Sequence, residues 1–216
     1  MSKKICVIGS TGLIGSTFLN SIDHSDYEQV TAITRREIES LNKKNHIKQA
    51  IYDFSDLEAI KPDLESDVLV CTLGTTIKIA GTQERFIEVD HDIPLEIAQL
   101  AVKAGCKQLI LISAIGANAK SSIFYSRVKG ELEDEIAKLP FAGIHILRPG
   151  ILLGKRAEGR PGEFIGKIIM RSLRLLIPWK YKPIHARIIA RTIHRIIQAG
   201  KTDLHFYEGR QLFDVK

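Results

Sequence analysis

The 216-residue chain lacks several features that would place it in a specialised class of protein. No apolar run reaches the roughly 20 residues that a membrane-spanning helix needs. There is no internal repeat, low-complexity tract or linker, which favours an ordinary globular chain. Histidines, cysteines and carboxylates do not occur with the spacing of a metal site, so no metal is expected.

Cysteine is scarce, and its placement predicts the compartment. Cys6, Cys71 and Cys106 lie in or beside apolar runs, which is typical of buried thiols in a reducing compartment. The first residues, Met1 to Lys4, lead directly into an apolar run, and no signal-peptide pattern follows. We therefore expect a cytoplasmic protein.

The net charge of +6 is unevenly distributed. Residues 155–201 hold twelve Lys and Arg against two Glu, so this segment carries +10 and the remainder −4. Such a segment could attract phosphates, nucleic acid or an anionic membrane, or it could form solvated helix faces beside an anionic cofactor. We favour the last interpretation, because aromatic residues are not interleaved with the cations as nucleic-acid stacking requires.

Residues 164–174 combine large apolar groups with regularly spaced cations, a pattern that fits an amphipathic helix on a membrane surface. A helix that packs on a sheet or roofs a substrate pocket gives the same pattern, so membrane contact is not favoured. The sequence leaves a homo-oligomer open.

A glycine-rich turn directly behind the first apolar run is the most informative motif. It reads Gly9-Ser10-Thr11-Gly12-Leu13-Ile14-Gly15, a GxxGxxG spacing after Ile5–Ile8. Gly9 permits a tight turn, Gly12 permits close approach of a pyrophosphate, and Gly15 permits close packing of helix and strand. Free N–H groups and the helix dipole then face the phosphates. Glycines also occur in ordinary strand-to-helix turns, so other motifs must support this interpretation.

Apolar runs alternate with helical patterns along the chain. Expected strands cover residues 5–8, 30–34, 47–52, 67–73, 108–112, 143–147 and 204–207, and expected helices cover 15–22, 83–104, 123–138, 163–176 and 186–199. The pattern predicts a doubly wound parallel sheet, the Rossmann fold of the α/β class. We expect one domain, residues 1–216, with a nucleotide-binding core over about 1–154 and a small C-terminal helical substrate cap over about 155–216.

Residues that follow the other strands extend the predicted dinucleotide site. Arg35 and Arg36 end the second strand, where NAD-binding proteins place a carboxylate; guanidinium groups there favour NADP(H) through its 2′-phosphate. Asp53 is placed to accept a hydrogen bond from the adenine amino group. Leu73-Gly74-Thr75 would pass under the adenosine ribose. Pro149 and Gly150 either border the nicotinamide or form a plain strand-ending turn.

The candidate catalytic group is a YxxxK motif in the expected helix 123–138. Tyr125 and Lys129 are four residues apart and share one helix face. A neighbouring ammonium favours the phenolate form of tyrosine, as acid–base catalysis near neutral pH requires. Ser113 ends the fifth strand, where its hydroxyl could orient a substrate carbonyl.

Taken in order, these motifs resemble those of the atypical short-chain dehydrogenases/reductases, and more narrowly the Tat-interacting oxidoreductase-like proteins and their bacterial relatives. The resemblance covers most of residues 4–165. It implies an NADP-binding Rossmann fold with Ser113, Tyr125 and Lys129 in the catalytic positions. Two positions depart from the pattern: Ala114 replaces a second serine, and Asp90 stands roughly where many short-chain reductases have asparagine.

Two functional hypotheses follow. The first is an NADP-dependent oxidoreductase acting on a carbonyl or alcohol of a small molecule, with Tyr125 as general acid or base, Lys129 as its partner and Ser113 as the orienting donor. The second is a non-catalytic NADP(H)-binding regulator, which Ala114, Asp90 and the basic C-terminal region favour. An apolar substrate is suggested by Ile165, Ile169, Leu173 and Trp179, which could equally be core residues.

Overall fold

Continuous apolar runs form a parallel sheet, because helices cover both of its faces. The computed structural model describes residues 2–154 and 182–214. Within them, a seven-stranded sheet has the order β3-β2-β1-β4-β5-β6-β9, with every pairing parallel. The strands are β1 Lys4–Ile8, β2 Gln29–Thr34, β3 Ile47–Ile51, β4 Val68–Cys71, β5 Gln108–Ile112, β6 Gly143–Arg148 and β9 Asp203–Glu208. A second small sheet pairs β7 (Leu152–Leu153) with β8 (Ile184–His185).

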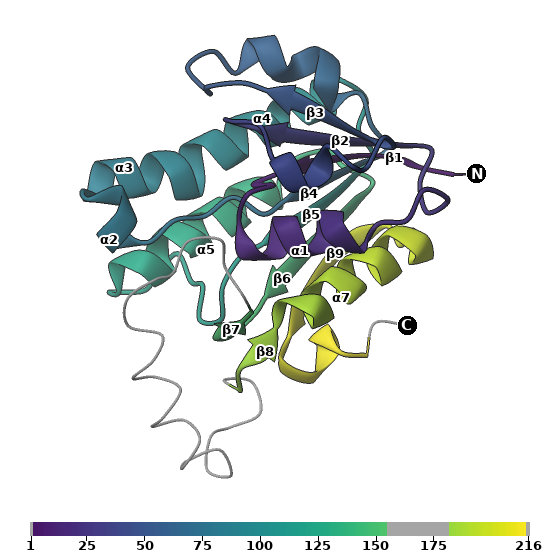
Figure 1. The fold of residues 1–216 in the computed structure, drawn as a ribbon. Helices are drawn as coiled ribbons and strands as arrows, with labels where there is room; N and C mark the ends of the chain where they lie inside the picture. The colour runs from purple at the N-terminus through teal and green to yellow at the C-terminus, as the bar shows by residue number, and fades with distance from the viewer. Residues whose placement is uncertain (1, 155–181, 215–216) are drawn as a thin grey trace.

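Two layers of helices enclose the large sheet (Figure 1). One layer holds α1 and α7, which pack against each other, and the other holds α4 and α5. In α7, Ile189, Ile193, Ile196 and Ile197 recur at helical spacing and are all buried against the sheet. The helices are α1 Leu13–Ser21, α2 Ile77–Ala80, α3 Gln83–Ile87, α4 Ile93–Lys103, α5 Phe124–Ile136 and α7 Ala186–Ala199, with short 3-10 helices η1 Glu39–Leu41, η2 Glu58–Leu64 and η5 Gly209–Leu212 and a π-helical turn η3 Glu88–Asp92.

The predicted doubly wound sheet is confirmed, and the expected strands agree with the observed ones to within two residues. Two helices differ from expectation. The first begins at Leu13 rather than after Gly15, so Gly15 lies inside α1. The helix expected over 83–104 is divided into α3, η3 and α4. The helix expected over 163–176 lies outside the described residues.

The described part of the C-terminal region contributes to the sheet and its cover. Helix α7 packs on α1, and β9 extends the sheet beyond β6. Cys6, Cys71 and Cys106 are buried free thiols, as expected. In the described ranges, the helices are too short or too polar to cross a bilayer. The division into a core and a cap remains a prediction.

Candidate functional site

The residues predicted to bind a dinucleotide follow the carboxyl ends of the parallel strands, which meet at one edge of the sheet. Strand β1 lies between β2 and β4, so the chain order reverses direction at this point. In open α/β sheets, ligands bind in the crevice at such a topological switch point. The glycine-rich turn follows β1, and residues 73–75 follow β4. The fold therefore brings these two segments to the edge where a nucleotide would bind.

The glycine-rich turn is held tightly against the end of β4. Gly9 has a φ of +80°, and a Cβ there would lie 2.5 Å from the carbonyl carbon of Thr72. A Cβ on Gly15 would lie 2.4 Å from the carbonyl oxygen of Gly9. The Thr72 hydroxyl donates to the carbonyls of Ile8 and Gly9, at 2.8 and 3.0 Å. Only glycine fits at positions 9 and 15 without moving backbone.

Side chains of the turn contribute unequally to its outer surface. Ser10 is buried, and its hydroxyl donates to the carbonyls of Val7 and Ile33, so it secures the turn to β2. Ile14 packs in the core, whereas Thr11 and Gly12 are exposed and Leu13 is half-buried. Gly12 is the N-cap of α1, and among the described residues no side chain caps this helix start. A ligand here would meet main-chain N–H groups, which suits a phosphate.

The segment after β4 is joined to a buried ion pair. The N–H of Thr75 donates to Oδ2 of Asp90 at 2.7 Å, and Nζ of Lys129 lies 2.7 Å from Oδ1 of Asp90. Asp90 and Lys129 are both buried. A Cβ on Gly74 would lie 3.3 Å from Oδ1 of Asp90 and 3.7 Å from Nζ of Lys129. Asp90 thus connects the β4 loop to the lysine of the YxxxK motif.

The sequence marks Asp90 as a departure from an asparagine but does not identify its partner, Lys129. One signal was present: Phe86, Asp90, Pro94, Ile97 and Ala101 recur at helical spacing and are all buried. A carboxylate on such an apolar face requires a partner when buried. Asp90 lies on the π-helical turn, a feature that is frequent at functional sites.

Tyr125 and Lys129 share a face of α5 at different depths. Tyr125 is 39% exposed, and Lys129 is 4% exposed. The buried ring of Phe86 on α3 lies 5.7 Å from the Tyr125 ring and 5.5 Å from that of Phe124, centroid to centroid. The tyrosine is therefore positioned at the surface, and the lysine reaches inward.

Helix α5 is held against the preceding loop and β6. A Cβ on Gly130 would lie 2.1 Å from the backbone nitrogen of Ala119, and the N–H of Asn118 donates to the carbonyl of Ser126. Glu133 of α5 also accepts hydrogen bonds from Arg148 at the end of β6. These contacts fix the helix that carries the YxxxK motif.

Ser113 has an unpartnered buried hydroxyl. Its N–H donates to the carbonyl of Leu147 at 2.8 Å, which continues the pairing of β5 with β6. Its Oγ makes no hydrogen bond to any described residue. A buried hydroxyl without a hydrogen-bond partner lowers stability by about 1–3 kcal/mol, and a ligand that bonds to it would remove this penalty. Pro149 lies beside it in the fold, since its carbonyl accepts from the N–H of Ile115, and Gly150 follows.

The residues predicted to contact the adenosine half of a dinucleotide lie at the ends of β2 and β3. Arg35 and Arg36 are exposed, and the carbonyl of Arg36 accepts a hydrogen bond from the Thr34 hydroxyl. Asp53 is exposed, and its Oδ1 accepts from the hydroxyl and the N–H of Ser55, which lowers the Asp53 pKa. Asp53 therefore presents an ionised acceptor beside the sheet edge.

This donor set fits a dinucleotide. Gly9 and Gly12 present no side chain to a ligand, the α1 start offers N–H groups, and exposed arginines can meet a phosphate. In the described residues there is no group of three His, Cys, Asp or Glu arranged for a metal ion.

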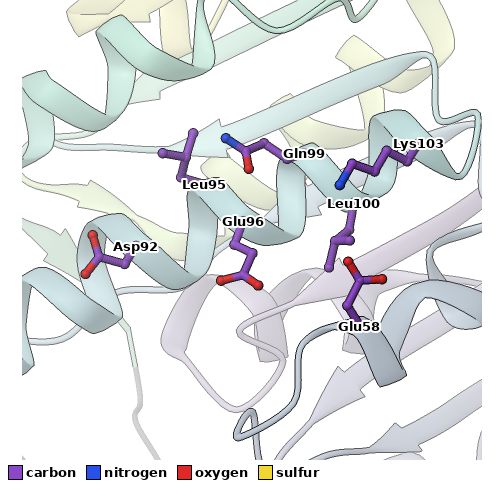
Figure 2. Close-up of a pocket in the computed structure, with 7 residues that line it drawn as sticks. All are labelled: Glu58, Asp92, Leu95, Glu96, Gln99, Leu100 and Lys103. Carbon is purple, nitrogen blue, oxygen red and sulfur yellow. The ribbon is translucent and has the colours of Figure 1, made fainter.

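A separate shallow pocket of about 330 Å³ lies between η2 and the outer side of α4 (Figure 2). Figure 2 shows that Glu58 comes from η2 and that Glu96 and Lys103 come from α4. The lining contains none of the predicted site residues, and four of its seven residues are charged, whereas substrate pockets are mainly apolar.

Comparisons with known proteins bear on the family and the fold of this chain. The sequence model of the HIM1 family matches residues 27–178. Protein HTATIP2 of Rattus norvegicus is 31% identical over 98% of this chain and 88% of its own length. Protein FMP52, mitochondrial, of Saccharomyces cerevisiae is 35% identical over 97% of this chain and 94% of its own length.

Among solved structures, MoeE5 in complex with UDP-glucose and NAD superposes with a TM-score of 0.71. The match has 14% identity and covers 97% of this chain and 79% of MoeE5. A likeness at this identity establishes the fold alone, and it confirms the Rossmann-like architecture.

The expected cytoplasmic location is contradicted, because the FMP52 relatives are named as mitochondrial proteins. The physical reason is that buried free thiols are typical of any reducing compartment and do not distinguish one such compartment from another.

Proposed function

The chain belongs to the HIM1 family, and on that premise we propose that it is an NADP-dependent oxidoreductase of the atypical short-chain dehydrogenase/reductase type. Its substrate would be a small molecule with a carbonyl or alcohol group. One observation supports the proposal: the buried hydroxyl of Ser113 follows β5, and the buried Lys129 ammonium lies near Gly74, which follows β4, so both lie toward the carboxyl ends of neighbouring strands.

The proposed roles follow from depth and chemistry. Ser113 donates its hydroxyl hydrogen to the substrate oxygen, because no described residue uses that donor. Tyr125, partly exposed on α5, exchanges a proton with the same oxygen. Lys129, four residues on, stabilises the phenolate and binds ribose hydroxyls from below. A bound nicotinamide would supply or accept the hydride.

The cofactor preference is proposed from the end of β2. Arg35 and Arg36 are exposed there, and a carboxylate that would repel a 2′-phosphate is absent from positions 34–36. Bidentate hydrogen bonds from guanidinium groups stabilise a phosphate monoester. MoeE5 was solved with NAD, which supports a nicotinamide dinucleotide in this fold; the phosphorylated form is the part proposed from the arginines.

The first experiment is a calorimetric titration of the purified protein with NADPH, NADP⁺, NADH and NAD⁺ in parallel. We expect NADPH and NADP⁺ to bind at least about tenfold more tightly than NADH and NAD⁺. If none of the four dinucleotides binds, the proposal is refuted. If NADH binds more strongly than NADPH, only the proposed role of Arg35 and Arg36 is refuted.

The second experiment is a carbonyl-reductase screen with Tyr125→Phe as the test variant. We expect the variant to lose at least about a hundredfold in turnover while it binds NADPH like the unmodified protein, because the phenol hydroxyl acts in proton transfer. Lys120→Met, on the loop before α5, is the surface control. Unchanged turnover in Tyr125→Phe would remove the tyrosine from its role.

A second function, a non-catalytic NADP(H)-binding regulator, is favoured by one observation. Asp90 pairs with Lys129 and so offsets the charge that would stabilise a Tyr125 phenolate. Tight NADPH binding without turnover across a broad set of aldehydes and ketones would support this alternative.

A further inference from the structure

Asp90 and Lys129 form a charge pair that the fold isolates from water. They are 0% and 4% exposed, and they are brought together from the π-helical turn η3 and from α5. Burial of two charges is expensive, and a well-packed apolar pair is often as stable. Stability therefore does not account for a buried charge pair at the candidate site, and we consider a role in ligand binding.

The two oxygens of Asp90 have different partners. Oδ2 accepts the N–H of Thr75 at 2.7 Å, and Oδ1 lies 2.7 Å from Nζ of Lys129. The Lys129 ammonium and the backbone after β4 are thus fixed relative to each other by one carboxylate. Gly74 lies directly above this junction, since a Cβ there would be within 3.7 Å of both charged groups.

The ammonium keeps donors for a ligand. Although Nζ is 2.7 Å from Oδ1, the two atoms are not aligned as a hydrogen bond, and Oδ1 has no hydrogen-bond donor among the described residues. Lysine has three N–H donors. The ion pair with Asp90 uses at most one of these donors, so at least two are left for a ligand.

Among the described residues, Asp90 is the carboxylate that forms an ion pair with this lysine. The Cys71 thiol on β4 lies near both charges, but burial raises its pKa to about 11, so it stays neutral. Glu133, the buried carboxylate on α5 itself, pairs with Arg148. Asp90 is accordingly the group that determines where the Lys129 ammonium lies.

We propose that Asp90 is a positioning residue: it fixes Nζ of Lys129 beside Gly74, with its donors facing the ribose hydroxyls of a bound dinucleotide. The inference rests on the proposed function, because it concerns the same site. It predicts that Asp90 acts on cofactor binding through Lys129, and that its effect disappears when the lysine is absent.

The experiment is a double-mutant cycle on the full chain, read by NADPH calorimetry. Asp90→Asn has the same shape and can still accept from Thr75, but it cannot balance the ammonium. We expect it to weaken NADPH binding by about tenfold or more, as does Lys129→Met. In the Lys129→Met background, Asp90→Asn should change the dissociation constant less than twofold, because the lysine through which it acts is gone.

Asp92→Asn is the matched control, since it removes an exposed carboxylate from the same π-helical turn. We expect it to bind NADPH like the unmodified protein. Circular dichroism melting checks that each variant is folded. If Asp90→Asn does not fold, Asp90→Glu, which keeps the charge and displaces it by one methylene, should still weaken NADPH binding.

The outcomes separate the two proposals. Failure of the unmodified protein to bind NADPH would overturn the proposed function and this inference with it. NADPH binding that Asp90→Asn or Asp90→Glu leaves unchanged would overturn the inference alone. Equal losses from Asp90→Asn with and without Lys129 would assign Asp90 a role independent of the lysine and would also overturn it.

Discussion

The ion pair between Glu133 and Arg148 gives a sharp test of how the site is supported. Nε of Arg148 lies 3.0 and 3.1 Å from the two carboxylate oxygens of Glu133. The guanidinium also lies over the ring of Phe206, 4.5 Å from its centroid. The pair ties α5, which carries Tyr125 and Lys129, to β6 and β9. Its loss should therefore weaken the whole side of the sheet that holds the YxxxK helix.

The two single variants should differ, because the partners differ in depth. The Glu133 side chain is 2% exposed, whereas that of Arg148 is 25% exposed. Arg148→Met leaves a buried carboxylate without its cation and also removes the contact with Phe206. We expect it to lower the free energy of unfolding by about 3 kcal/mol, the low end for a broken buried pair because Arg148 is partly solvated. Glu133→Gln leaves a guanidinium that can reach water, and we expect about 1–2 kcal/mol.

Urea unfolding followed by circular dichroism measures both values, and thermal melting gives a second readout. For a chain of this size, about 3 kcal/mol corresponds to a fall of roughly 6–12 °C in Tm. The double variant Glu133→Gln with Arg148→Met should lose less than the sum of the two, since no charge is then left buried. The reasoning is refuted if Arg148→Met is the milder single variant, or if the two losses simply add.

Three further predictions concern other parts of the molecule. Gly130→Ala places a Cβ within 2.1 Å of the Ala119 backbone, so it should destabilise the protein by about 2 kcal/mol or more in urea unfolding, whereas a neutral result would show that the loop yields easily. Arg35→Ser combined with Arg36→Ser should weaken NADPH binding by roughly tenfold and leave NADH binding unchanged in calorimetry, because only the 2′-phosphate contact is lost; equal losses for both would argue against that contact. Burial and the nearby His205 lower the pKa of His145 from 6.5 to about 4, so between these pH values the folded imidazole is neutral while the unfolded one binds a proton. The free energy of unfolding should therefore be unaffected by His145 above pH 6.5 and should fall by at most about 3 kcal/mol as the pH is lowered toward 4. In urea unfolding, His145→Asn should lose less of its free energy of unfolding over this pH range than the unmodified protein.

Local pattern was sufficient for the elements. The apolar run Gln108–Ile112 forms a strand buried on both faces, and the repeated isoleucines of 186–199 form a helix with one buried face. The GxxGxxG turn predicted a strand–turn–helix unit, and Gly9 and Gly15 indeed lie where only glycine fits. The elements depend on neighbours within about four residues, which is the range over which a sequence pattern carries information. The exclusion of a Cβ at Gly9 depends also on Thr72, which the tertiary fold brings there.

The composition of the site was predictable from the sequence to a lesser extent. Tyr125 and Lys129 share a helix face because of their spacing, but their different depths follow from the packing of Phe86 and Asp90 on α5. Ser10 was expected at the cofactor because it belongs to the turn, yet its hydroxyl bonds to Val7 and Ile33. The orientation of a loop side chain depends on the strand beside it, which the loop sequence does not specify.

By itself, the sequence determined the fold class, the positions of the strands and helices, and the family of motifs that predict a dinucleotide site. Only the tertiary structure decided the strand order, the contact of Thr72 with the glycine turn, and the buried pair of Asp90 with Lys129. The physical reason is distance along the chain. Partners from separate elements meet only after the sheet has assembled, and the energy of a buried charge depends on which partner the assembled fold places beside it.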